Sequence, residues 1–141
     1  MYTMNVPLDK VVMTQPYVEK DGLVTYLRKH DRGEPLTVHV REMDGKYYVL
    51  DGHHNSVVAD LVGDNTIEAI VHEHKMDYDP RVQGAYLVSV RWGQVENASM
   101  QFGTVPEFRA QQSPWMRNEV MARSCLNVPA PQERTYDRAA A

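Results

Sequence analysis

Hydrophobic and polar residues alternate most regularly in the second quarter of this chain. Leu36, Val38 and Val40 alternate with polar neighbours, the period of two that is typical of a strand with one buried face. The dipeptide Asp44-Gly45 favours a tight turn, and residues 47–50 return as a second apolar strand. We therefore predict a β-hairpin here.

Two other stretches have the spacing of amphipathic helices. Residues 21–30 place Leu23 and Leu27 on one face, with Asp21 as the candidate N-cap. Residues 55–62 follow the hairpin and end before Gly63, a residue suited to a helix C-terminus. Both helices are short, and each has one apolar face to bury.

Residues 66–71 are β-branched and apolar, and residues 11–13 are a short apolar run. Both are predicted to be strands. A strand, a helix, a hairpin, a helix and a strand in this order predict an α/β (α+β) fold with a mixed sheet and short helices.

The second half of the chain has a weaker pattern. Residues 86–92 alternate in a way that favours a strand, although Val82, Tyr86 and Val90 also fit one helix face. Residues 93–112 are mostly polar, so we predict a loop. Ser113-Pro114 predicts the start of a last helix, which makes a C-terminal helical extension.

Length and composition limit the possible classes of protein. A chain of 141 residues fits one domain, which we divide into a core at 5–76, an extension at 77–130 and a flexible tail at 131–141. A net charge of −4 weighs against broad binding to nucleic acid. One cysteine allows no internal disulfide, and there is no long apolar run or secretory signal. We expect a cytoplasmic protein with no membrane partner; its oligomeric state stays open.

The candidate site begins where the hairpin meets the second helix. The first amide N–H groups of a helix lack partners within it and carry partial positive charge, so they bind anions. Gly52 allows a close approach of the backbone to a phosphate. His53 and His54 can donate hydrogen bonds or act as acid and base near neutral pH. Asp51 can accept a proton, bind Mg²⁺ or cap the helix.

A metal centre is an alternative. If residues 72–74 lie on a strand, His72 and His74 point to one face, and His53 or His54 could complete three nitrogen ligands for Zn²⁺. The chain has no cysteine pair and no His-Glu-x-x-His spacing. We therefore assign no metal ligands.

The order of several short motifs resembles the ParB/sulfiredoxin-like superfamily, including its ParB-like nuclease domains. The matching pieces are Val6-Pro7-Leu8, Gln15-Pro16, the segment from Gly33 to Val38 and the segment from Tyr48 to His54. The resemblance covers residues 6–74, and the variant Asp51-Gly52-His53-His54 resembles that of members that are free-serine kinases. Other members are partition proteins that bind CTP.

This resemblance implies a nucleotide site. Gly52, His53, His54, Asn55 and Ser56 would bind the phosphates of ATP, ADP or CTP with Mg²⁺. Asp51, His53 and His54 would be catalytic, together with Glu19, which matches a region that supplies a general base in the kinase-like relatives. The implied activity is a phosphotransferase or an NTPase.

Two departures from the family pattern keep other functions open. Sulfiredoxins have a catalytic cysteine where this chain has His53, so that activity is not expected. Asn55 stands where the family usually has arginine, and arginine binds phosphate with two parallel hydrogen bonds. Arg28, Lys29 or Arg41 would have to supply the missing charge. The alternatives are a DNA-binding protein or nuclease of a phage or other mobile element, and a non-catalytic interaction protein.

Overall fold

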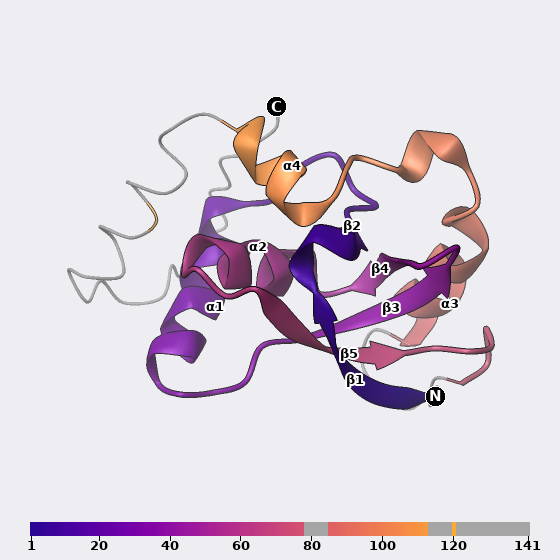
Figure 1. The fold of residues 1–141 in the computed structure, drawn as a ribbon, viewed down its shortest axis with the longest axis horizontal. Coiled ribbons are helices and arrows are strands. Elements are labelled where there is room, and N and C mark those ends of the chain that lie inside the picture. The colour runs from indigo at the N-terminus through magenta and orange to yellow at the C-terminus, as the bar shows by residue number, and fades with distance from the viewer. Residues whose placement is uncertain (78–84, 113–119, 121–141) are drawn as a thin grey trace.

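The computed structural model describes residues 1–77, 85–112 and 120. Within them, one five-stranded sheet is packed against four α-helices (Figure 1). The strands are β1 (Tyr2–Pro7), β2 (Val11–Val12), β3 (Thr37–Met43), β4 (Lys46–Asp51) and β5 (Thr66–Val71). The α-helices are α1 (Lys20–Asp31), α2 (His53–Leu61), α3 (Ala85–Gln94) and α4 (Val105–Ala110). The predicted α/β class is confirmed.

The sheet has the strand order β1-β5-β3-β4-β2, with both parallel and antiparallel pairs. β1 and β2 therefore lie at opposite edges, although only the 3₁₀ turn Leu8–Lys10 separates them. Four strand spacings in a flat sheet measure about 19 Å, whereas the chain from Pro7 to Val11 can span only about 14 Å. The sheet must therefore curl until its two edges approach each other, and Figure 1 shows β1 followed by this turn and then β2.

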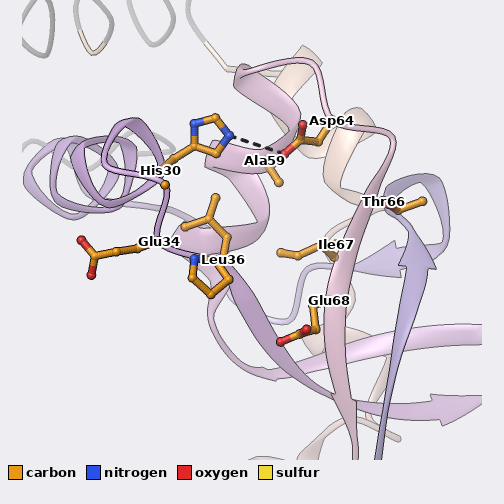
Figure 2. A pocket seen from close by; sticks show the side chains of 10 residues that line it. His30, Glu34, Leu36, Ala59, Asp64, Thr66, Ile67 and Glu68 are labelled. Carbon is orange, nitrogen blue, oxygen red and sulfur yellow. Dashed lines mark ion pairs between the residues drawn. The ribbon is translucent and has the colours of Figure 1, made fainter.

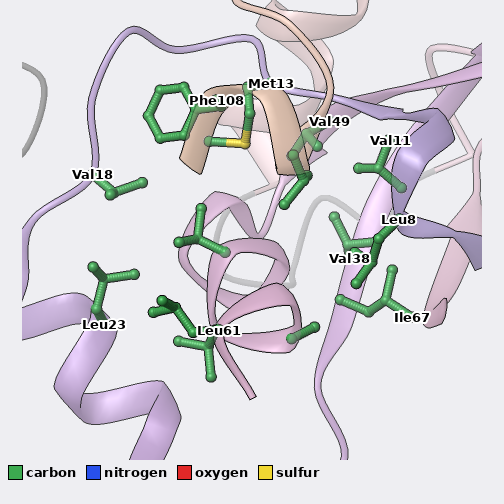
Figure 3. Packing of buried hydrophobic residues seen from close by; sticks show 14 of the residues in the cluster. Leu8, Val11, Met13, Val18, Leu23, Val38, Val49, Leu61, Ile67 and Phe108 are labelled. Carbon is green, nitrogen blue, oxygen red and sulfur yellow. The ribbon is translucent and has the colours of Figure 1, made fainter. Parts of the chain in front are cut away.

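The main core lies on one face of this sheet. Side chains of the sheet meet those of α1, α2 and α4 in one cluster (Figure 3). Leu23 of α1, Leu61 of α2 and Phe108 of α4 are each at most 2% exposed there. A smaller cluster joins Leu50 of β4 to Val88 of α3. The first turn of α2 is thus fixed between a well-packed sheet and two neighbouring helices.

The hairpin, both early helices and the strand at 66–71 are confirmed, with differences at their ends. Asp44 and Gly45 have φ angles of 54° and 79°, which suit a tight hairpin turn. The N-cap of α1 is Glu19, so the assignment of Asp21 to that position was wrong. α2 begins at His53, two residues earlier than predicted, which places both histidines within its first turn.

The second half of the chain corrects two predictions. The alternation over 86–92 belongs to α3, a helix that buries Ala85 and Val88, and Tyr86 is 83% exposed. The stretch 93–112 contains α4, whose start carries a capping box formed by Thr104 and Glu107. The last predicted helix, of which only Val120 is described, and the tail at 131–141 lie outside the described residues. No helix in the described ranges has the length and apolar character to cross a membrane.

Candidate functional site

The candidate site lies where β4 turns into α2. Gly52 is the N-cap residue and has φ 101° and ψ 32°, a left-handed conformation that strongly favours glycine. A Cβ at this position would lie 3.1 Å from the carbonyl oxygen of Thr37 and 3.2 Å from the Cα of Val38. Glycine is therefore required here both by the backbone angle and by the neighbouring strand.

Among the residues that the structure describes, no side chain caps the start of α2. The first helical hydrogen bond is donated by the amide of Ser56 to the carbonyl of Gly52, at 3.1 Å. The amides of His53, His54 and Asn55 precede it and have no acceptor among the described residues. These three N–H groups lie where the sequence analysis expects an anion to bind.

His53 is buried, and its imidazole faces the loop after β2. Its Nε2 accepts a hydrogen bond from the amide of Thr14 at 3.1 Å and lies 2.9 Å from the Thr14 hydroxyl oxygen. That hydroxyl donates to the carbonyl of Val49. His53 therefore holds the first part of the 14–19 loop.

His54 holds the other end of the same loop. Its Nε2 accepts a hydrogen bond from the amide of Glu19 at 3.0 Å. The ring stacks near Tyr26, with centroids 6.4 Å apart, and also packs directly against Gly22. The two histidines thus fasten the 14–19 loop to the first turn of α2.

Both imidazoles are neutral at pH 7. Burial lowers the pKa of His54 to about 4. Burial, with smaller contributions from the charges of Arg91 and His54, lowers the pKa of His53 well below its ordinary value. Because each Nε2 accepts a hydrogen bond, the ring proton of each histidine lies on Nδ1. Neither Nε2 is therefore placed to donate to a phosphate or to exchange a proton with a substrate.

The side chains of Asn55 and Ser56 donate hydrogen bonds to backbone carbonyls. The amide nitrogen of Asn55 donates to the carbonyl of Thr37 at 2.6 Å. The hydroxyl of Ser56 donates to the carbonyl of Gly52 at 3.0 Å. These two predicted binding residues can thus contribute backbone, but their side chains fix the helix to the sheet and to its own N-cap.

The two residues with candidate catalytic carboxylates, Asp51 and Glu19, adjoin this arrangement. Asp51 is the last residue of β4 and is half-buried, immediately before Gly52. Glu19 is brought to the site because its amide donates to His54, although the two residues are far apart in the sequence. The structure therefore gathers all four predicted catalytic residues at one end of α2, with two in supporting roles.

Sequence reasoning missed two residues at this site, Thr14 and Arg91. Arg91 comes from α3, and its Nη1 lies 3.2 Å from the hydroxyl oxygen of Thr14 and 3.4 Å from Nε2 of His53. It is the one charged residue within the segment AYLVSVRWGQ, a signal that could have singled it out. Arg41, by contrast, donates to the Trp92 carbonyl and to Glu96.

The geometry gives no support to the zinc alternative. β5 ends at Val71, so His72 and His74 do not share a strand face. His72 instead pairs with His39, with 2.9 Å between Nε2 of His72 and Nδ1 of His39. Within residues 1–77, 85–112 and 120, no three His, Cys, Asp or Glu side chains are grouped to hold a metal ion.

Two surface hollows lie near the other end of α2. One, of about 300 Å³, is lined by His30, Glu34, Asp64 and Glu68 above an apolar floor that includes Leu36 (Figure 2). The other, of about 370 Å³, shares Asp64 and adds Asp9 and Asp60. These carboxylates and the C-terminal end of the helix dipole both repel anions. The hollows are therefore unsuited to a phosphate ligand.

Comparison with known proteins does not assign the chain to a family. No protein-family model matches it, and no curated protein matches it.

Proposed function

We propose that this protein binds the phosphate groups of a nucleotide at the start of α2. The observation that supports this most strongly is the uncapped helix start that follows Gly52. The N-cap residue, Gly52, has no side chain that could accept from these amides, and the side chains of Asn55 and Ser56 donate to backbone carbonyls. Three amide donors at the positive end of the helix dipole are thus left for an external acceptor.

The fastened loop supports the same proposal. A phosphate site must hold its donors in place before the ligand arrives, because ordering them on binding would cost affinity. His53 and His54 fix the 14–19 loop beside the helix start through its own backbone. Their Nδ1–H groups have no acceptor among the described residues and are further donors. In this proposal the histidines organise the site and do not exchange protons.

The reaction class proposed is phosphoryl transfer or nucleotide hydrolysis, as the resemblance implies. Such reactions depend mainly on positioning and charge neutralisation. Glu19 is the candidate base, and Asp51 is the carboxylate that can contribute one oxygen to Mg²⁺. A magnesium ion bound with a nucleotide commonly takes one or two protein carboxylates and keeps several waters, so a single aspartate fits. The metal would neutralise charge on the phosphates.

Amide chemical shifts test the binding site directly. The ¹⁵N-labelled protein is titrated with ATP, ADP, CTP and inorganic phosphate, with Mg²⁺ and with EDTA, and with adenosine as the phosphate-free control. We expect the amides of residues 53–55 to shift with the phosphate-bearing ligands only. The start of α4 is the internal control, because the Glu107 carboxylate already accepts from Thr104 there.

The result also separates the competing functions. Unchanged chemical shifts of the 53–55 amides at millimolar ligand concentrations would refute the phosphate site. Binding to a short DNA duplex at low salt, with those amides unchanged, would favour the nuclease alternative. Binding of nucleotide without release of phosphate or transfer to serine would indicate a binding module.

A further inference from the structure

Arg91 occupies an unusual position for a permanently charged side chain. It is half-buried, and its Nε is fully buried without a hydrogen-bond partner. Its hydrogen-bond partners are the hydroxyl oxygen of Thr14 and Nε2 of His53, which are both neutral. His53 itself is only 5% exposed, so this guanidinium is anchored to a rigid part of the site.

In the described part of the chain, Arg32, Arg41 and Arg109 are paired with carboxylates. Arg28 resembles Arg91 in having buried guanidinium nitrogens without a hydrogen-bond partner. Arg41 donates to Glu96 at 2.7 Å, and Arg109 donates to Asp60. Arg91 has no carboxylate within ion-pair distance among the described residues; Asp51 acts on it only at longer range. Removing a charge from water without a compensating partner is costly. Within residues 1–77, 85–112 and 120, no partner of opposite charge lies close enough to offset this cost for Arg91.

We infer that Arg91 is the guanidinium that binds the phosphate of the ligand at the start of α2, taking the place of the arginine absent at position 55. This inference rests on the proposed function and adds a specificity-determining residue to it. Arg91 is joined to the first residue of α2 through the imidazole of His53. It lies in α3, beyond the part of the chain that resembles the ParB/sulfiredoxin-like superfamily.

The chemistry of a guanidinium group and a phosphate group suits this role. A guanidinium presents several N–H donors in a plane and can bind two phosphate oxygens at once. Nη1 of Arg91 is engaged by Thr14 and His53, which fixes the plane of the group and leaves other donors. Ligands with a phosphate dianion should therefore bind better than carboxylates of the same size.

The test compares three variants with the wild-type chain. Arg91→Met removes the charge and keeps the length of the side chain, and Arg91→Lys keeps the charge without the planar fork. Arg41→Met is the matched control, because Arg41 also contacts α3, through the Trp92 carbonyl, but pairs with Glu96. Affinities for ATP and inorganic phosphate are measured by calorimetry, and folding is checked by thermal unfolding and amide spectra.

We expect Arg91→Met to weaken ATP binding by about 10- to 100-fold, the range for a charged hydrogen-bonding partner. Arg91→Lys should recover part of this loss, and Arg41→Met should bind as the wild type does. Phosphate should raise the unfolding temperature of the wild type and leave that of Arg91→Met unchanged. A structural role alone would lower the unfolding temperature without changing these affinities.

The outcomes distinguish this inference from the proposed function. If Arg91→Met and the wild type bind ATP with equal affinity, and the 53–55 amide signals shift, the role of Arg91 is refuted and the binding site at the start of α2 is supported. If Arg91→Met loses phosphate binding, but the 53–55 amide signals of the wild type do not shift with ligand, the role of Arg91 in binding is supported and the binding site at the start of α2 is refuted. A wild-type chain without affinity for ATP or phosphate would overturn both.

Discussion

The contact between Gly22 and His54 allows a sharp test of how the two histidines are held. A Cβ on Gly22 would lie 2.5 Å from Cδ2 and 2.7 Å from Nε2 of His54, far inside van der Waals distance. In Gly22→Ala the ring must therefore move, and Nε2 leaves the amide of Glu19. Overpacking costs about 1–3 kcal/mol and the lost hydrogen bond about 1 kcal/mol. The gain from alanine in a helix is at most about 1 kcal/mol.

Gly22→Ala should thus lower the free energy of unfolding by roughly 1–3 kcal/mol. Gly93→Ala in α3 is the matched control, because a Cβ there meets nothing within 4 Å. It should be neutral or stabilising by up to about 1 kcal/mol. Urea unfolding with an unchanged m-value measures both, and the penalty of Gly22→Ala should disappear in a His54→Ala background. If Gly22→Ala were as stable as Gly93→Ala, the ring could not be packed as described.

Three further predictions concern stability. The pKa of His54 is about 4 in the folded chain and about 6.5 when unfolded, so its contribution is complete above pH 6.5 and is lost as the pH falls towards 4. When the pH is lowered from 7 to 5, the free energy of unfolding measured with denaturant should therefore fall by about 2 kcal/mol less in His54→Gln than in the wild type. Equal decreases in the two proteins would refute this prediction. Gly52→Ala should destabilise by about 1–3 kcal/mol because of its positive φ and the close Thr37 oxygen, whereas a neutral result in thermal unfolding would contradict that geometry. Asp60→Asn should cost about 1 kcal/mol because it breaks the partly exposed ion pair with Arg109 that joins α2 to α4, and an Arg109→Met background should remove most of that difference in a double-mutant cycle.

The parts of the fold that the sequence predicted are those with a strong local signal. The hairpin has both its alternation and its turn residues within one short stretch, and residues 66–71 are almost entirely apolar or β-branched. β1 was missed because only Met4 and Val6 face the core, and its pairing with β5 is far away in the sequence. α3 was misassigned because its valines and aromatic residues alternate locally, while its buried residues, Ala85 and Val88, are three positions apart, as on one face of a helix.

The geometry around the candidate site residues could be predicted only in part. The left-handed turn at Gly52 follows from local sequence, and the helix start follows from it. The directions of the two imidazoles depend on α2 beginning at His53, and on a loop brought over them by α1. Arg91 reaches the site only because α3 packs against β4, so a long-range contact determines it. Local patterns contain no information of that kind.

One short N-terminal segment supplies both edges of the curled sheet. During synthesis β1 is made first, yet Val6 has no partner until Ile67 has been made. The hairpin of β3 and β4 can form early, whereas the two outer strands must be added late, and such long-range pairing slows folding. Proteolytic removal of this segment would uncover backbone groups on both sides of the remaining strands at once. The truncated chain should then aggregate through its open strand edges.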